Sequence, residues 1–356
     1  MSEFQLRRTF FAAAVVALSL GWACPASGAN RHAAGPTTHV ATSTPAEVFA
    51  YWTKARMAQA RSGDLSGAAR RPLLPGGWAT SLSDRSPYIA SERGPAHLTP
   101  TSARGPNDES NQSAFQIYNF GFYHYKVVGR LYYTEPNGLP YTCSGTVVSR
   151  DVIVTAGHCA YTATSTPTGW NSQQMFVPDK YGNSTPYGKW AISTQSTWPR
   201  WQQSAWWPHD YAFLKIAPDA SGRNIGDVTG WAGMVINATS IGDIWSIGYP
   251  RTGFFRTWDG EYGYYCYSPY SDYSTIVDSD GVTGYDIGYG CYMTGGASGG
   301  PMFTLYNGSW INVVSVNSHC WPVGCNEEGQ NVWSRNLWGP YFDDNTLALY
   351  KIAENS

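Results

Sequence analysis

Residues 294–301, Thr-Gly-Gly-Ala-Ser-Gly-Gly-Pro, place one serine, Ser298, between two pairs of glycines. Glycine adopts backbone angles that are closed to other residues and lets a second segment approach closely. A nucleophilic serine needs both properties, because its hydroxyl must stand clear of a tight turn while backbone N–H groups point at the oxyanion that forms on attack. A glycine-rich surface turn has the same composition, so this stretch indicates a nucleophile only together with other features of the chain.

The composition points to a turn-rich β protein. The chain has 356 residues, of which 13% are charged and 15% aromatic, with many glycines and prolines. This length suits one large domain or two ordinary ones. The formal net charge of −2 gives no basic surface for nucleic acid or an anionic membrane. We therefore expect a β-rich protein that binds neither.

The N-terminus has the pattern of an export signal. Arg7 and Arg8 precede an apolar run over residues 10–23, and the small residues 27–29 suit cleavage after Ala29. The pattern predicts a signal peptide over residues 1–29 and leaves the general and the twin-arginine export routes open. No later stretch is long and apolar enough to span a membrane. We expect a secreted, extracellular protein without membrane attachment once the signal is removed.

Residues 30–114 differ from the rest of the chain in being rich in Ala, Arg, Ser, Pro and Gly without cysteine. Thr44 and Glu47 form a capping-box pattern with Pro45 at the first helical position, which predicts a helix through about Ala60. The remainder resembles a linker. Two interpretations stay open: a pro-segment that is removed on maturation, which we favour, or a disordered N-terminal extension.

From about residue 115 onward, short strands separated by turn signals dominate. The predicted strands are residues 127–134, 141–148, 151–155, 211–216, 243–247, 285–289, 301–305, 310–316 and 331–337. Residues 343–353 predict a closing helix. Many short strands without alternating helices favour an all-β fold of β-barrels over a parallel α/β sheet.

Two further segments carry candidate catalytic residues. His158 precedes Cys159, and Cys143 stands sixteen residues before it, so these cysteines bracket a predicted hairpin. Asp210 opens an apolar strand, where a buried carboxylate can meet an imidazole. Taken singly, a histidine is more often a core residue and an Asp more often caps a turn.

Together the segments 155–159, 210–215 and 295–301 resemble the three signature blocks of chymotrypsin-fold serine proteases, in that family's order of His, Asp and Ser. The resemblance covers roughly residues 120–353. It implies a protease domain over residues 115–356, built as two six-stranded antiparallel β-barrels with a short C-terminal helix. The segment 51–57 also resembles leader segments of secreted actinobacterial proteases, which supports the pro-segment interpretation.

The resemblance implies a role for each residue of the site. Ser298 is the nucleophile, His158 the general base and acid, and Asp210 the group that orients the imidazole. The N–H groups of Gly296 and Ser298 form the oxyanion hole. The implied function is a secreted serine endopeptidase, a monomer without metal or cofactor, acting on protein or peptide substrates.

One position departs from the animal members of the family. Those members carry an Asp directly before the nucleophile, which pairs with a new N-terminal amine on activation, whereas this chain has Ala297. Zymogen activation through that ion pair is therefore not expected. The block around Ser298 is closer to the bacterial glutamyl-endopeptidase branch.

The resemblance also implies the residues of the substrate pocket. They are Tyr292, Met293, Thr294, Asn317, Ser318 and His319. Members that cut after Glu carry a histidine where this chain has Asn317, and members that cut after Arg or Lys carry an Asp where it has Tyr292. His319 shares a strand face with position 317 and is either a substrate ligand or a neighbour of Cys320. The preferred residue at the cleavage site stays open.

The six cysteines after the signal favour disulfides over a metal site. The resemblance implies Cys143–Cys159. A short loop suits Cys320–Cys325, which leaves Cys266–Cys291, and a swap among these four stays open. Asp272, Asp278 and Asp280 lie close together in a predicted loop, where a solvated acidic turn is preferred over a calcium site.

The sequence also has features that suit functions other than a peptidase. The pattern at 296–300 also fits the nucleophile elbow of α/β-hydrolases, but no acid lies between Ser298 and His319, the one histidine that follows it. A catalytically silent protease-like module for binding or adhesion would explain the many aromatic residues, although all three catalytic candidates are present. An ester or a specialised peptide as substrate also stays open.

Overall fold

The computed structural model describes residues 35–63, 75–76, 88–91, 114–118, 121–239, 241–251, 258–268, 271–277, 280–320 and 336–356. The predicted signal peptide, Asp278 and Cys325 lie outside these ranges. Within them, no helix is long and apolar enough to cross a membrane.

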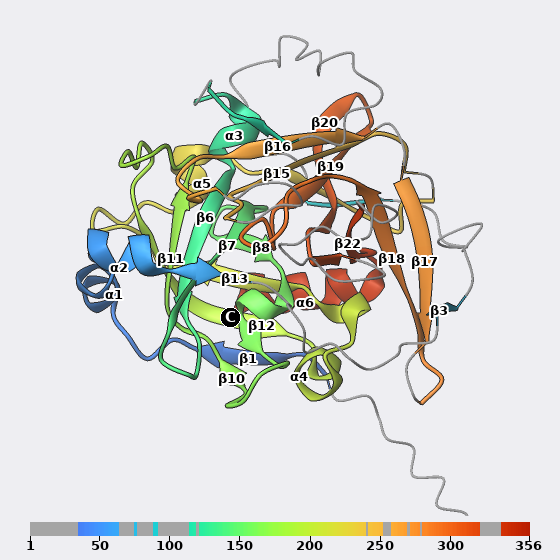
Figure 1. Cartoon of the computed structure of the whole chain (residues 1–356), viewed down its shortest axis with the longest axis horizontal. Coiled ribbons are helices and arrows are strands. Elements are labelled where there is room, and N and C mark those ends of the chain that lie inside the picture. The colour runs from blue at the N-terminus through green and yellow to red at the C-terminus, as the bar shows by residue number, and fades with distance from the viewer. Residues whose placement is uncertain are drawn as a thin grey trace, which may run out of the picture. The chain divides into compact units, whose positions relative to one another are not determined.

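The first part of the fold is a closed antiparallel barrel of six strands (Figure 1). Its strands are β6 (Val128–Thr134), β7 (Pro140–Val147), β8 (Val152–Thr155), β11 (Ser172–Pro178), β12 (Trp190–Thr197) and β13 (Ala212–Ile216). They pair in the order β12-β11-β6-β7-β8-β13, and β12 pairs with β13 to close the ring. A β-hairpin of β9 (Tyr161–Thr162) and β10 (Gly169–Trp170) follows β8.

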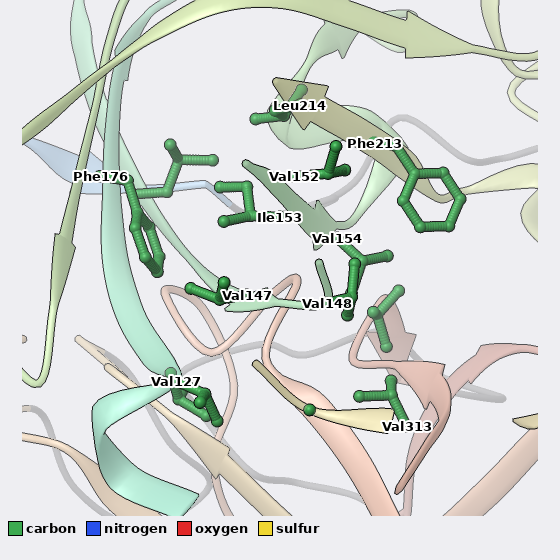
Figure 2. Packing of buried hydrophobic residues seen from close by; sticks show 14 of the residues in the cluster. Val127, Val147, Val148, Val152, Ile153, Val154, Phe176, Phe213, Leu214 and Val313 are labelled. Carbon is green, nitrogen blue, oxygen red and sulfur yellow. The ribbon is translucent and has the colours of Figure 1, made fainter. Parts of the chain in front are cut away.

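Buried β-branched and aromatic side chains fill this barrel, as expected for a barrel of this size. Figure 2 shows members of the cluster from the barrel strands, among them Val147, Ile153, Phe176 and Leu214. Val313 belongs to a strand of the second part of the fold but to the same cluster. The two parts of the fold therefore share one continuous apolar core.

The second part consists of two sheets. The first runs in the order β4 (Tyr88–Ser91), β14 (Gly233–Ile236), β20 (Ser309–Val316), β19 (Pro301–Tyr306), β15 (Ile244–Gly248), β16 (Tyr264–Ser268) and β5 (Phe115–Gln116). The second runs in the order β21 (His319–Cys320), β22 (Asn336–Pro340), β18 (Thr283–Gly290), β17 (Ser271–Val277) and β3 (Pro75–Gly76). Only the β14–β20 pair of these sheets is parallel among the described strands. A second cluster with residues of both sheets, including Ile244 and Ile287, forms their core.

Short helices connect the strands. They are α3 (Tyr123–Lys126), η1 (Gly157–Cys159), α4 (Pro199–Ser204), η2 (Trp207–His209) and α5 (Ile225–Thr229). The closing helix α6 (Asp344–Asn355) starts at Asp343, whose carboxylate accepts hydrogen bonds from the N–H groups of Asn345 and Thr346. The side chains of Leu349 and Tyr350 are buried. The predicted all-β class and the C-terminal helix are confirmed.

Residues 35–63 of the N-terminal segment form strands and helices that pack on the barrel. Strand β1 (Thr37–Val40) extends the barrel sheet beside β12, and β2 (Arg61–Ser62) pairs in parallel with β7. Between them lie α1 (Pro45–Tyr51) and α2 (Lys54–Gln59), which Figure 1 shows beside β11. The predicted capping box is present: Thr44 N–H donates to Glu47 at 2.7 Å.

The prediction of one helix through Ala60 is wrong, because the segment breaks into two helices after Tyr51. Trp52 ends α1 with its side chain buried among Tyr132 and Met175, and its indole N–H donates to Gln173 O at 2.5 Å. Thr53 then caps α2 by accepting from Arg56 N–H. Burial of the Trp52 indole thus ends the first helix, and capping by Thr53 starts the second.

Candidate active site

His158 lies in the single turn η1, directly after β8. The disulfide Cys143–Cys159 joins β7 to this turn, as the resemblance implied. Gly157 gives the turn room, since a Cβ there would lie 2.9 Å from Asp210 Oδ1 and 3.1 Å from Trp201. The backbone and side chain of His158 are thereby held against the segment that carries Asp210.

Asp210 is fully buried at the end of η2 and accepts three hydrogen bonds. The N–H of His158 donates to Oδ1 at 2.7 Å, and Nδ1 of the same residue lies 2.8 Å from Oδ2. The Ser318 hydroxyl donates to Oδ2 at 2.5 Å. Burial alone would raise the pKa of Asp210, but the charge of His158 and these hydrogen bonds outweigh it and lower that pKa. The carboxylate therefore stays ionised and accepts a hydrogen bond from the Nδ1–H group of His158.

Ser298 sits in a turn whose glycines are structurally required. Gly296 has φ 95° and Gly299 has φ 80°, values that other residues rarely adopt. A Cβ on Gly299 would lie 2.0 Å from Thr155 Oγ1 and 2.4 Å from Ser144 O. The turn therefore packs directly on strands β7 and β8 of the barrel.

Hydrogen bonds join this turn to the barrel next to His158. Ser144 N–H donates to Ser298 O at 2.7 Å, and the Ser144 hydroxyl donates to Gly296 O at 2.9 Å. Ser298 O also lies 3.9 Å from Cys159 Sγ. Within the described residues, the N–H groups of Gly296 and Ser298 make no hydrogen bond.

The Ser298 hydroxyl donates a hydrogen bond to the N-terminal segment. Its acceptor is Gly63 O, at 3.1 Å. Gly63 follows β2, and its N–H donates to Thr142 O at 2.7 Å. The Arg251 guanidinium also donates to Ala60 O. The sequence carried no signal for Gly63, because a glycine in a polar linker-like segment is unremarkable by itself.

The residues expected to form the substrate pocket are mostly buried. Asn317 is fully buried, and its amide bonds to Ser246, Tyr289 and Ala297 O at distances of 2.9–3.2 Å. Ser318 contacts Asp210, as described above. Met293 lies in the core, Thr294 is buried, and Tyr292 is half-buried. Their role in a pocket stays a prediction, and Asn317 would have to give up internal hydrogen bonds to contact a substrate.

His319 lies behind the His158–Asp210 pair. Its Nδ1 is 2.9 Å from Ser318 Oγ, and its Nε2 is 3.4 Å from Asp286 Oδ2. Its ring stacks on Trp207 at a centroid distance of 4.0 Å. The sequence analysis did not identify Asp286 as a site residue. An acid inside a Gly- and Tyr-rich strand does not indicate which residue of another element it faces.

The second disulfide, Cys266–Cys291, joins β16 to the end of β18, so this pairing is present as well. Cys320 lies in β21, and its pairing with Cys325 stays a prediction. In the described part of the chain, one group of side chains has metal-donor spacing: Cys143, His158 and Cys159. Its two sulfurs share a disulfide and its imidazole bonds Asp210, so this set does not fit a metal ion.

Comparison with known proteins places the chain in a family. The model of the family described as Trypsin matches residues 122–335. A curated relative, "Extracellular metalloprotease" of Bacillus subtilis (strain 168), is 25% identical over 226 residues. The match covers 62% of this chain and 64% of that protein, so the chain spans less than two thirds of its relative's length.

Solved structures agree on the fold. Protease Anisep from Arthrobacter nicotinovorans is 27% identical, with a TM-score of 0.51 over 65% of this chain and 96% of its own. The thermostable serine protease AL20 from an extremophilic microorganism is 22% identical, with a TM-score of 0.52 over 65% and 98%. A Glu endopeptidase in complex with MPD is 16% identical, with a TM-score of 0.50 over 69% and 99%. The last two show the fold alone, but the family model spans more than half of the chain, and the chain therefore belongs to the trypsin family of chymotrypsin-fold serine proteases.

Proposed function

We propose that the chain is a secreted serine endopeptidase that hydrolyses peptide bonds through Ser298, His158 and Asp210. The observation that carries this proposal is the buried Asp210 carboxylate bonded to both the backbone N–H and the Nδ1 of His158. That pairing fixes the imidazole tautomer with its proton on Nδ1, which leaves Nε2 as the base.

The proposed reaction proceeds by two acyl transfers. Ser298 Oγ attacks the carbonyl carbon as His158 Nε2 takes its proton, and the N–H groups of Gly296 and Ser298 bind the oxyanion. The tetrahedral intermediate collapses, the C–N bond breaks, and His158 returns the proton to the leaving amine. Water then attacks the acyl-enzyme with His158 again as base, which releases the carboxylic acid and restores Ser298. Asp210 stabilises the imidazolium in both steps.

Secretion is supported by the two described disulfides, which persist in oxidising compartments. The predicted signal over residues 1–29 and the word "Extracellular" in the relative's name agree with it. The same name also says metalloprotease, but the one candidate donor set in the described ranges does not suit a metal, and we derive no step from one.

Hydrolysis of an unstructured protein by the matured chain tests the proposal. Asp210→Asn should lower kcat by roughly four orders of magnitude, because the amide would present a donor to His158 Nδ1 and favour the wrong tautomer. A half-buried control that pairs with Arg223 instead of a histidine, Asp219→Asn, should leave kcat unchanged. Equal activity in wild type and Asp210→Asn would refute this mechanism, and a folded but inactive wild type would favour the alternative, a protease-like binding module.

We further infer that residues 30–114 contain a pro-segment that keeps the site latent. The Ser298 hydroxyl has one proton, and while Gly63 O accepts it, the proton is not directed at His158. The parallel pairing of β2 with β7 and the donation from Arg251 to Ala60 O hold the segment at this position. Its helices anchor it through the apolar cluster of Val48, Trp52 and Tyr132. Removal of the segment would free the nucleophile.

A further inference from the structure

A second buried acid, Asp286, lies behind the His158–Asp210 pair. Asp286 belongs to β18 and is fully buried, and within the described residues neither of its carboxyl oxygens makes a hydrogen bond. The group within ion-pair distance of it is His319 Nε2, at 3.4 Å. A buried carboxyl without such bonds is costly, so its presence here calls for an explanation.

The local sequence explains how this acid becomes buried. Gly284 and Gly288 lie two residues to either side of Asp286 and so share its face of β18. A Cβ on Gly284 would lie 2.5 Å from Pro208 and 2.7 Å from Trp206. The absence of side chains at these glycines therefore lets Pro208 and Trp206 pack beside Gly284, and Trp338 of β22 beside Gly288, on the face of β18 that carries Asp286.

A continuous chain of polar contacts runs from Asp286 to the active site. His319 Nδ1 lies 2.9 Å from Ser318 Oγ, and that hydroxyl donates to Asp210 Oδ2 at 2.5 Å. The same Oδ2 lies 2.8 Å from His158 Nδ1. All five groups are buried, so water does not compete for these contacts.

For a neutral His319, the hydrogen-bond directions along this chain fix where each proton lies. Ser318 has one hydroxyl proton and donates it to Asp210, so it accepts from His319, whose proton must therefore be on Nδ1. A neutral His319 then has a bare Nε2, which needs a donor. Asp286 supplies that donor if it keeps its own proton and its Oδ2 moves slightly closer to His319 Nε2 than the present 3.4 Å.

We propose that Asp286 is a positioning residue for the hydrolysis: it shares one proton with His319 and thereby fixes His319 as the donor to Ser318 and Ser318 as the donor to Asp210. This proposal rests on the proposed function of the Ser298 site. Asp286 touches no reacting atom and acts through Asp210.

The electrostatics of the site agree with this geometry. Burial, reinforced by the charge of Asp210, raises the pKa of Asp286 well above its ordinary value. Burial also lowers the pKa of His319 to about 3. Both directions place the shared proton on Asp286 and leave His319 neutral, with Asp210 as the one anion of the chain.

Two substitutions separate this role from simple packing. In the matured protein, Asp286→Leu fills a similar volume but cannot donate to His319, so Ser318 is no longer held as a donor and Asp210 loses a hydrogen bond. We expect kcat to fall roughly tenfold with little change in KM, the effect of one hydrogen bond to a charged group. Asp286→Asn retains an N–H donor and should recover most of that loss.

The pH profile gives a second readout. Loss of the Ser318 donor strengthens the pull of Asp210 on the His158 cation, so the acid limb of kcat/KM should move to higher pH in Asp286→Leu and return in Asp286→Asn. Asp179→Asn is the matched control, since Asp179 is also buried but accepts from Gly121 N–H, outside this chain of contacts. It should keep the wild-type profile. If Asp286→Leu does not fold, His319→Phe keeps a ring on Trp207 and should show the same loss and shift.

Three outcomes would overturn the proposal. They are full activity in Asp286→Leu, equal losses in the Leu and Asn variants, and an unshifted acid limb in both the Leu and the His319→Phe variants.

The proton NMR signal of His158 Nδ1–H provides a test that needs no turnover, because Asp286→Leu should shift it and Asp286→Asn should not. An inactive wild type in which this signal still responds would refute the proposed function while supporting the contact chain.

Discussion

Gly299 has no room for a side chain, and at the residue scale this explains the glycine-rich stretch around Ser298. It combines φ 80° with contacts that a Cβ would violate, at 2.0 Å from Thr155 Oγ1. We predict that Gly299→Ala destabilises the protein by about 3 kcal/mol or more, from the left-handed backbone and the clash together. Urea unfolding would measure it.

The matched control for this prediction is Gly281→Ala. Gly281 has the same φ of 80° but nothing within 4 Å of its Cβ position. Gly281→Ala should lower the free energy of unfolding by only about 1 to 2 kcal/mol, which is the cost of the left-handed backbone conformation alone. Equal costs at the two positions would mean that close packing of the Ser298 turn on the barrel contributes nothing.

Some residues of the site could be predicted from the sequence and others could not. His158, Asp210 and Ser298 each stand in a local pattern, and the structure joins the first two by hydrogen bonds and seats Ser298 beside Cys159. Asp286 and Gly63 have no such pattern. Their contacts join segments far apart in the chain, and only the fold brings these segments together.

At the element scale, β2 and the glycine after it connect the N-terminal segment to the nucleophile. A Cβ on Gly63 would lie 2.2 Å from Tyr133 OH and 2.7 Å from Cys143 Sγ. We predict that Gly63→Ala displaces the segment, so that a phosphonylating reagent labels Ser298 in the unprocessed chain about tenfold faster, the equivalent of roughly 1.4 kcal/mol. Intact mass over time measures the rate.

Gly35→Ala controls for the change of residue type, because Gly35 lies in the same segment with nothing within 4 Å of its Cβ position. It should label at the wild-type rate. If Gly63→Ala labels no faster than Gly35→Ala, the segment does not restrain the nucleophile.

The N-terminal helices show what local patterns can and cannot predict. The capping box at Thr44 predicted where α1 begins, because capping depends on neighbours three residues apart. The break after Tyr51 depends on the burial of Trp52 against Tyr132 and Met175, which are distant in sequence. The start of α1 thus depends on local sequence, whereas the break after Tyr51 depends on tertiary contacts.

At the scale of the whole molecule, buried neutral histidines link stability to pH. Burial lowers the pKa of His209 to about 3, with the charge of Arg200 adding to the effect. Between its ordinary pKa of 6.5 and about 3, the unfolded chain binds a proton that the folded chain does not, so the free energy of unfolding falls as pH falls. His209 contributes about 1.4 kcal/mol per pH unit over most of that window.

His209→Phe keeps an aromatic ring against Trp198 and Trp206 and removes the titrating group. We predict that the free energy of unfolding falls less steeply between pH 6 and 4 in His209→Phe than in wild type. Above pH 7 the free energies of the two proteins should change with pH in the same way. Denaturant unfolding at several pH values measures both slopes. Identical slopes below pH 6 would show that His209 is not buried in its neutral form.

The proposed activity depends on Ser298 being an activated nucleophile. The most direct measurement is intact mass of the matured protein after reaction with a phosphonylating reagent, for wild type, Ser298→Ala and the exposed-serine control Ser221→Ala. We expect one label per chain in wild type and Ser221→Ala, and none in Ser298→Ala. A folded, processed wild type that takes no label, or a label that persists in Ser298→Ala, would contradict it.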